Sequence, residues 1–397
     1  MILKKYAIKV IAVVVLAFGA FACSTRFVSA SKAQKFFRNH CVQGQNIFED
    51  KNDAQRAYDT LLKFSGDQEK LDQVSDIKKL AGGFSGAIIF SFILEEHSYV
   101  GRLFASDHSQ QEMLEEVTAQ SAGAELGYAP KIYVYDLQKR SVIMDLVQGK
   151  SLNDPSLTHN DSLLKECACA LRAMHGVTRS ANPDLQIHEY TKNRIGLDAQ
   201  ALIKSCIQMF PESVVIPELR NYAQQLSDVA SSMPHAVALT HNDIHCGNIL
   251  VDDVGSVKII DWTDSGYDNP LNDCAIFLNQ YVNEHAPVLE NREKFLKYYF
   301  GRDPSAQELA WLRILLNLYR IEVIGHIITT PSVIAHPSSS FQEALKKSIE
   351  LYVRDGIYDE TLAKNSGYIV YAIRAWIEEM KLYISQEFDE DKRLLQS

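Results

Sequence analysis

The sequence lacks several features that mark common classes of protein. It has seven cysteines but no CxxC pair, and it shows no low-complexity tract and no repeat with a period of roughly 20–50 residues. Cys167 and Cys169 are two residues apart in a helical pattern, where side chains at that spacing face apart. A zinc site is therefore not expected, and buried free thiols are.

Positive charge is also scarce. The chain has 40 lysine and arginine residues against 50 aspartate and glutamate residues, which gives a formal net charge of -10. That balance argues against a nucleic-acid partner, because nucleic acids are bound by basic surfaces. It suits a cationic small substrate, although many acidic proteins bind no such ligand.

No apolar run reaches the roughly 20 residues that a transmembrane helix needs. The run at residues 10–23 is unbroken but shorter, and it follows Lys4, Lys5 and Lys9. A small-residue cleavage site follows at residues 28–30. This layout is typical of a secretory signal peptide, and a retained membrane anchor is the alternative. Residues 1–30 therefore predict a protein that is exported or associated with a membrane, on its cytoplasmic face if the leader is retained.

The rest of the chain predicts an α+β fold with two lobes. The 397 residues, 46% hydrophobic and 23% charged, suffice for one large two-lobed domain or for two domains. Residues 31–75 predict a helical extension, residues 76–147 a mainly β first lobe with one helix, and residues 148–397 a mainly helical second lobe. The first lobe has strand patterns at residues 87–94, 99–104, 131–135 and 141–146 and a helical pattern at 109–126. The second lobe has helical patterns at residues 161–176, 195–210, 217–232, 271–283, 290–300, 305–329, 341–355 and 361–387, and the charged residues after them are expected to fray.

Polar residues that could take part in catalysis are concentrated at residues 239–273. Apolar runs at 249–251 and 257–260 flank a turn-forming cluster, which predicts a β-hairpin. Asn248 enters the first arm and Asp261 leaves the second, so an amide oxygen and a carboxylate converge at the open end. Asp243 precedes them in a separate loop. Two oxygen ligands beside a third carboxylate suit a reaction of a Mg²⁺–phosphate complex.

A glycine-rich turn at residues 80–86 lies between strands of the first lobe. Such a loop lets backbone N–H groups approach phosphates, although an ordinary hairpin turn has the same composition. Arg102 lies within the following strand, either facing outward or aimed at phosphates. Glu112 and Glu116, in the next helix, are the two candidates to hold it.

These motifs, in this order, resemble those of the aminoglycoside phosphotransferase and choline kinase family. His241-Asn242-Asp243, Asn248 and Ile260-Asp261-Trp262 resemble the family signature HxDxxxxN…IDW. The HND triplet and the segment at residues 266–273 favour the choline and ethanolamine kinase branch. Further likenesses are the nucleotide loop at 82–86, the third strand at 99–103, the Ala-Pro-Lys turn at 127–132 and the Leu-x-x-x-His helix at 171–175.

The resemblance implies a protein-kinase-like fold that uses ATP and Mg²⁺ to phosphorylate the hydroxyl of a small molecule, such as a cationic amino alcohol. It implies that Asp243 orients or deprotonates the acceptor, that His241 braces the loop, and that Asn248 and Asp261 bind Mg²⁺. The implied nucleotide contacts are Gly82, Gly83, Ser85, Gly86, Arg102 held by Glu116, and, where the two lobes meet, Asp145 and Val147.

Other functions stay open on the same residues. The acceptor could be an aminoglycoside, thiamine or another metabolite, and a nucleotide-binding pseudokinase that acts as a scaffold or exported effector is the alternative that is not an enzyme. The sequence reads Asp261-Trp262-Thr263 where protein kinases have DFG, and Asp264 falls one residue later than the branch's acidic residue. Aromatic side chains available to a choline pocket are Trp311, Tyr319, Tyr298, Tyr299 and Trp376.

A secretory leader on an ATP-dependent enzyme raises a question of location. The leader could be a retained anchor with the catalytic lobe in the cytosol, it could serve export from a bacterium into a host, or it could route the chain to a compartment that holds ATP.

Overall fold

The computed structural model describes residues 32–42, 47–80, 86–157, 160–190, 194–232, 237–285, 288–329, 339–365 and 369–396. The predicted leader at residues 1–30 lies outside the described residues, and so do Gly82, Gly83 and Ser85. Within the described ranges, every helix is too short or too polar to cross a membrane. The chain divides into two compact units, Met1–Val117 with Pro130–Leu146 and Thr118–Ala129 with Val147–Ser397, called the β unit and the helical unit below.

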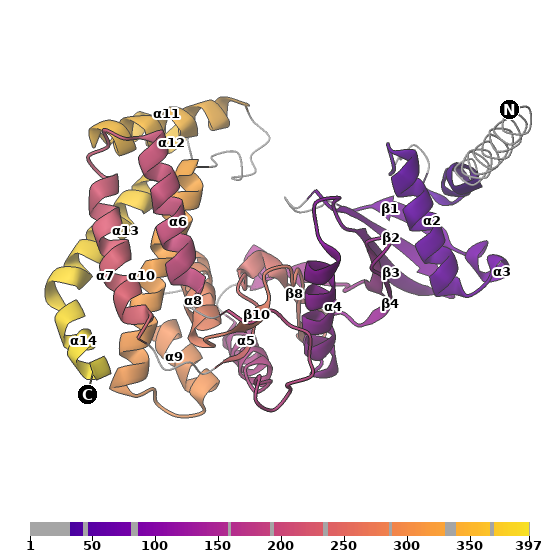
Figure 1. Ribbon diagram of the computed structural model, residues 1–397, viewed down its shortest axis with the longest axis horizontal. Coiled ribbons are helices and arrows are strands. Elements are labelled where there is room, and N and C mark those ends of the chain that lie inside the picture. The colour runs from indigo at the N-terminus through magenta and orange to yellow at the C-terminus, as the bar shows by residue number, and fades with distance from the viewer. Residues whose placement is uncertain are drawn as a thin grey trace, which may run out of the picture. The chain divides into compact units, whose positions relative to one another are not determined.

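The β unit is built on a 5-stranded antiparallel sheet in the order β1-β2-β3-β5-β4 (Figure 1). Its strands are β1 (Ser75–Lys79), β2 (Ile88–Leu94), β3 (His97–Leu103), β4 (Ile132–Asp136) and β5 (Ser141–Asp145). The register pairs Arg102 with Ile89 on one side and Val142 on the other. The predicted strands are therefore confirmed, and Arg102 lies within a central strand.

Helices at the start of the chain pack on this sheet and share its core. They are the helix of residues 32–40, α2 (Lys51–Ser65) and α3 (Gln68–Leu71). Phe36 and Leu61 from these helices lie in one hydrophobic cluster with Phe90 and Phe92 from β2. The Arg56 guanidinium donates hydrogen bonds to the main-chain oxygens of residues 104, 139 and 140. The helical extension is thus an integral layer of the β unit.

Helix α4 (Gln110–Glu125) begins with a reciprocal cap. The Ser109 hydroxyl accepts from the Glu112 N–H, and the Glu112 carboxylate accepts from the Ser109 N–H at 2.8 Å. This capping box satisfies two N–H groups that the first helical turn leaves unpaired. It also commits Glu112 to the helix end.

The helical unit is organised around α10 (Ala306–Thr329), which is apolar on nearly every side and largely buried, as a helix without a polar face must be. It packs against α6, α7, α8 and α14 (Figure 1). The other helices of the unit are α5 (Asp161–Met174), α6 (Arg194–Met209), α7 (Ile216–Ala230), α8 (Leu271–His285), α9 (Val288–Phe300), α11 (Ser339–Asp355), α12 (Glu360–Asn365), α13 (Ile369–Gln386) and α14 (Phe388–Gln396).

Short strands and 3₁₀ turns carry the polar stretch between α7 and α8. They form one sheet in the order β6-β8-β9 and a second, β10-β7. The elements between α7 and α8 are β7 (Ala238–Thr240), η2 (Cys246–Asn248), β8 (Ile249–Val251), β9 (Val257–Ile259) and β10 (Gly266–Asp268). Strand β6 (Lys150–Ser151) and η1 (Pro155–Leu157) come earlier in the unit, before α5. The predicted α+β fold with a β lobe and a helical lobe is confirmed.

The helical pattern predicted at residues 361–387 is observed as α12 and α13, and residues 366–368 between them lie outside the described residues. The prediction that the charged end frays is wrong, because it forms α14. The Asp391 carboxylate is 1% exposed and accepts from Arg313 Nε at 2.9 Å and from the Tyr383 hydroxyl at 2.8 Å. An ion pair between this buried carboxylate and the half-buried Arg313, with the added hydrogen bonds, docks a helix that composition alone assigns to solvent. The cysteines of the described residues are free thiols, as expected, and Cys167, Cys206, Cys246 and Cys274 are buried.

Candidate active site

The predicted hairpin is confirmed and fixes two candidate metal ligands. Strands β8 and β9 pair Ile249 with Ile259 and Val251 with Val257. The Ile260 N–H donates to the Asn248 carbonyl at 2.9 Å, which extends the ladder by one step at its open end. Asn248 therefore lies across from the residue that precedes Asp261. At the closed end, the Asp252 carboxylate accepts from two turn N–H groups.

Asn248 and Asp261 offer the oxygen chemistry that Mg²⁺ prefers. The Asn248 amide nitrogen donates to the Asp243 carboxylate at 3.0 Å and to its carbonyl at 2.9 Å, so the amide oxygen is the atom left for a ligand. Asp261 is exposed, has φ +61°, and accepts from the Thr263 hydroxyl at 2.9 Å. In the part of the chain that the structure describes, no group of three or more His, Cys, Asp or Glu could hold a metal. A two-ligand site suits Mg²⁺, which takes its remaining ligands from phosphate and water.

His241 is a fixed, uncharged part of the loop that carries Asp243. It is fully buried, its Nε2 lies 3.0 Å from the Ile260 carbonyl, and its Nδ1 accepts from the Asp243 N–H at 3.3 Å. These partners assign the proton to Nε2. Burial lowers the pKa of His241, which keeps the ring neutral. The predicted bracing role agrees with these contacts.

Asp273 anchors the same loop from the first turn of α8. Its carboxylate, which is fully buried, accepts from the N–H groups of His241 and Asn242, each at 2.8 Å, and from His175 Nε2 at 3.0 Å. The other nitrogen of His175 accepts from the Tyr299 hydroxyl at 2.7 Å. Burial raises the pKa of Asp273, but the donors outweigh it and the net shift is downward. The loop is thus held by a buried carboxylate whose ionised form its hydrogen-bond donors favour.

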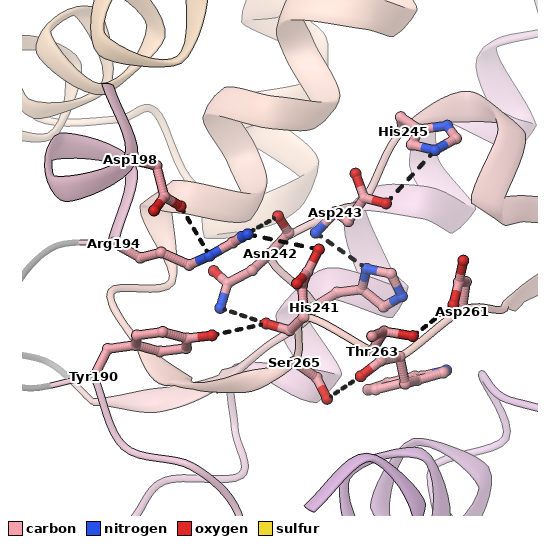
Figure 2. Close-up of polar contacts among 12 residues, drawn as sticks. Tyr190, Arg194, Asp198, His241, Asn242, Asp243, His245, Asp261, Thr263 and Ser265 are labelled. Atoms are coloured by element: carbon pink, nitrogen blue, oxygen red, sulfur yellow. Dashed lines mark hydrogen bonds and ion pairs between the residues drawn. The ribbon is translucent and has the colours of Figure 1, made fainter. Parts of the chain in front are cut away.

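Asp243 projects from this braced loop and is 39% exposed (Figure 2). The Asp243 carboxylate, which accepts a hydrogen bond from the Asn248 amide, also lies 3.7 Å from His245 Nε2. Burial raises the pKa of Asp243 to about 7, with help from the Asp264 and Asp261 carboxylates. A carboxylate with a raised pKa accepts a proton readily near neutral pH, which is what a general base requires. His245 itself accepts from the Gly247 N–H at 2.9 Å, so it is part of the loop rather than a free surface residue.

A cluster around Arg194 is the part of the site that the sequence analysis missed. Arg194 begins α6, and its guanidinium donates to the Asn242 carbonyl at 2.8 Å, with Asp198 at 3.1 Å and Asp264 at 3.5 Å (Figure 2). No sequence spacing links it to Asp243, because the fold alone brings α6 to the loop. Glu322 of α10 couples electrostatically to the same groups. The sequence did carry a signal for Glu322, which is an acidic residue within a long, mostly apolar helical pattern.

Two alternatives were predicted for Arg102, an outward-facing side chain or a side chain held by a glutamate, and the structure shows the second. Arg102 is 7% exposed rather than facing outward, and its Nη1 donates to Glu116 at 2.6 Å. Its guanidinium also lies over the Phe104 ring, 4.6 Å from the centroid. Glu116 is therefore the partner, since Glu112 caps α4. Gly86, the described residue of the predicted nucleotide loop, has φ +68°, a conformation that favours glycine.

The two residues predicted to lie at the nucleotide base differ in what they offer. The Asp145 carboxylate accepts from the Tyr133 hydroxyl at 2.9 Å and the Lys131 N–H at 3.3 Å, so it is committed to β4 and β5. The Val147 N–H and C=O form no backbone hydrogen bond within the described ranges. Val147 is thus the residue whose backbone is available to a base.

An aspartate whose pKa is raised, on a braced loop and next to an amide and a carboxylate at a hairpin mouth, is the arrangement that a kinase-like phosphotransferase requires. Residues 76–313 match the phosphotransferase enzyme family, and the chain belongs to this family. It is a small-molecule phosphotransferase by that membership, with a kinase-like fold of one β and one helical unit.

Solved structures are similar to the chain at low sequence identity. A choline/ethanolamine kinase family protein from Mesorhizobium loti has a TM-score of 0.54 and 15% identity over 86% of this chain and 99% of its own. An ethanolamine kinase from Plasmodium vivax has 0.53 and 14% over 87% and 94%. A choline kinase from Cryptosporidium parvum has 0.55 and 11% over 82% and 94%. A search of curated protein sequences found no match. The similarity to solved structures supports the fold and leaves the acceptor open.

Proposed function

We propose that the protein transfers the γ-phosphate of ATP to the hydroxyl of a choline- or ethanolamine-like amino alcohol, with Mg²⁺ as the metal. The observation that carries the proposal is the arrangement of Asp243, Asn248 and Asp261 on one loop and one hairpin. The family supplies the reaction class, and the acidic surroundings of Asp243 favour an acceptor with positive charge.

The chain's own residues account for the steps. Asp243 accepts the proton of the acceptor hydroxyl. At the same time the oxygen of that hydroxyl bonds to the γ-phosphorus, and the bond from this phosphorus to the leaving oxygen of ADP breaks. The hydrogen bond from the Asn248 amide orients the accepting carboxylate. Asn248 and Asp261 would hold Mg²⁺, which when bound neutralises phosphate charge. In the β unit, Arg102 with Glu116 supplies a fixed cation for phosphate. Val147, the first residue of the second segment of the helical unit, offers a backbone contact for the base.

The test is ADP release from ATP and Mg²⁺ by the full-length chain, measured against choline, ethanolamine, aminoglycosides, thiamine and neutral alcohols. Asp243→Asn, which keeps the shape but not the charge, is compared with Asp303→Asn, which changes a carboxylate that is 81% exposed. Turnover with an amino alcohol that is lost in Asp243→Asn and kept in Asp303→Asn supports the proposal. Retained ATP binding with no turnover on any acceptor would instead indicate a pseudokinase.

We also propose that residues 1–30 direct the chain to or through a membrane. The support is the sequence pattern of lysines, apolar run and cleavage site. Cell fractionation with protease accessibility tests the alternatives. A protease-protected, membrane-bound enzyme would rule out export, and a shortened chain outside the producing cell would rule out a retained anchor.

A further inference from the structure

We propose that Arg194 is a positioning residue for phosphoryl transfer. Its guanidinium fixes the peptide group that joins Asn242 to Asp243, and in this way it aims the carboxylate that accepts the proton. The inference rests on the proposed function and deepens it, because it gives a role in the reaction to a side chain of α6, which lies outside both the loop and the hairpin.

The peptide group between Asn242 and Asp243 is held at both of its polar atoms. The Asn242 carbonyl accepts from Arg194 Nη1 at 2.8 Å, and the Asp243 N–H donates to His241 Nδ1 at 3.3 Å. Because a peptide group is planar, fixing its oxygen and its nitrogen fixes the whole plane. This plane sets the direction in which the Asp243 side chain leaves the backbone. Arg194 therefore orients the base from one edge of the peptide and His241 from the other.

The backbone of Asn242 needs to be held because its conformation is uncommon. Asn242 has φ +62°, in the left-handed region that residues other than glycine rarely adopt, and it is 4% exposed. Its N–H donates to Asp273 at 2.8 Å, and its side-chain amide donates to the Asp264 carbonyl at 3.2 Å. Such a conformation persists where several contacts specify it together. Without the bond from Arg194, the carbonyl that leads into Asp243 is free to turn.

Arg194 is itself held in a way that points one donor at this carbonyl. Its Nε lies 3.1 Å from the Asp198 carboxylate, and its Nη2 lies 3.5 Å from the Asp264 carboxylate (Figure 2). Its backbone N–H donates to the Asp268 carboxylate at 3.3 Å. The guanidinium is a rigid, planar fork of donors. With Nε and Nη2 engaged by two carboxylates, the remaining nitrogen, Nη1, is directed to the Asn242 carbonyl.

The geometry of the fork, rather than its charge, distinguishes Arg194 from any other cation. Two carboxylates, from Asp198 and Asp264, lie beside the one guanidinium and balance its charge. A lysine at this position would keep the charge but would carry a single nitrogen on a flexible stem. One nitrogen cannot take the places of the three that contact the loop, α6 and the segment after the hairpin. Arg194→Lys therefore separates positioning from charge.

The experiment measures ADP release by the full-length chain with ATP, Mg²⁺ and ethanolamine, or the acceptor that wild type turns over fastest. Arg194→Ala is expected to lower kcat about 10–100-fold, because a misplaced catalytic group costs about this much. The KM values for ATP and the acceptor should stay within about threefold, since the aim of the base acts on the transition state. The matched control is Arg302→Ala, whose exposed guanidinium pairs with Glu308 at 2.7 Å and which should keep wild-type values.

Arg194→Lys is expected to stay at least about threefold below wild type in kcat. Wild-type kcat in Arg194→Lys would overturn the role of the fork. Wild-type kcat in Arg194→Ala, or a rise in KM with kcat unchanged, would overturn the positioning role altogether.

Hydrogen exchange, followed by mass spectrometry without substrates, tests the hold of Arg194 apart from turnover. The Asp243 amide should exchange about tenfold faster or more in Arg194→Ala than in wild type or Arg302→Ala, while the amides of β8 and β9 keep their protection. Unchanged exchange at the loop, or faster exchange across the whole helical unit, would overturn the inference. If wild type turns over no acceptor, the proposed function fails, and exchange still decides whether Arg194 holds the loop.

Discussion

Replacing Asp273 by asparagine should destabilise the helical unit and disable the catalytic loop together. The carboxylate accepts three hydrogen bonds, from two loop N–H groups and from His175, and is fully buried. An amide keeps one acceptor oxygen and turns an N–H₂ group toward a donor. Leaving one or two buried donors unpaired costs about 1–3 kcal/mol each, so we expect a loss of about 2–5 kcal/mol.

The assay is thermal and urea unfolding of the full-length chain, with ADP release measured on the same samples. Since roughly 1 kcal/mol shifts the midpoint of a unit of this size by about 2–4 °C, the expected decrease is about 4–20 °C. Activity should fall about tenfold or more at temperatures where the variant is still folded, because the Asp243 loop loses its anchor. Asp303→Asn is the exposed control. An unchanged midpoint with unchanged turnover would refute the view that Asp273 holds the loop.

Three further predictions concern packing, the C-terminal helix and proton uptake. Gly101→Ala should destabilise the β unit by about 1–3 kcal/mol, because the added Cβ would overlap the buried Phe90 ring; urea unfolding measures it, and unaltered stability would show that the sheet can move. Asp391→Asn should cost about 1–3 kcal/mol by breaking its pair with Arg313, whereas the exposed Asp389→Asn should stay within about 0.5 kcal/mol; equal effects would contradict a docked α14. Because the pKa of Glu322 is raised to about 8, its contribution to stability is present below the ordinary glutamate pKa and is lost as pH rises toward 8. Glu322→Gln should therefore become more stable than wild type between about pH 5 and 8, and a constant difference in melting temperature across that window would contradict the shift.

The sequence predicted the hairpin and its polar ends because that information is local. Alternating apolar residues set the arms, turn residues set the loop, and Asn248 and Asp261 follow from their places at the arm ends. The choice between Glu112 and Glu116 could not be made this way. It depends on which glutamate the start of α4 uses as its own cap.

The Arg194 cluster could not be predicted because it is made by contacts distant in sequence. Arg194 reaches the Asn242 carbonyl 48 residues along the chain, and Glu322 comes from a helix that follows still later. The docking of α14 was not predicted for a similar reason. The charged residues after residue 387 look solvated until Arg313 is known to face Asp391. Composition measures polarity, but only the fold shows whether a polar group has a partner.

The most direct test of the central claim is phosphorus NMR of the full-length chain with ATP, Mg²⁺ and ethanolamine, comparing wild type with Asp243→Asn. The account predicts a new phosphomonoester resonance that grows with the loss of the γ-phosphate signal in wild type and does not appear in the variant. A phosphomonoester formed at the wild-type rate by Asp243→Asn would contradict the role of Asp243 as the base. Release of inorganic phosphate alone, with every acceptor in the panel, would contradict the transfer itself.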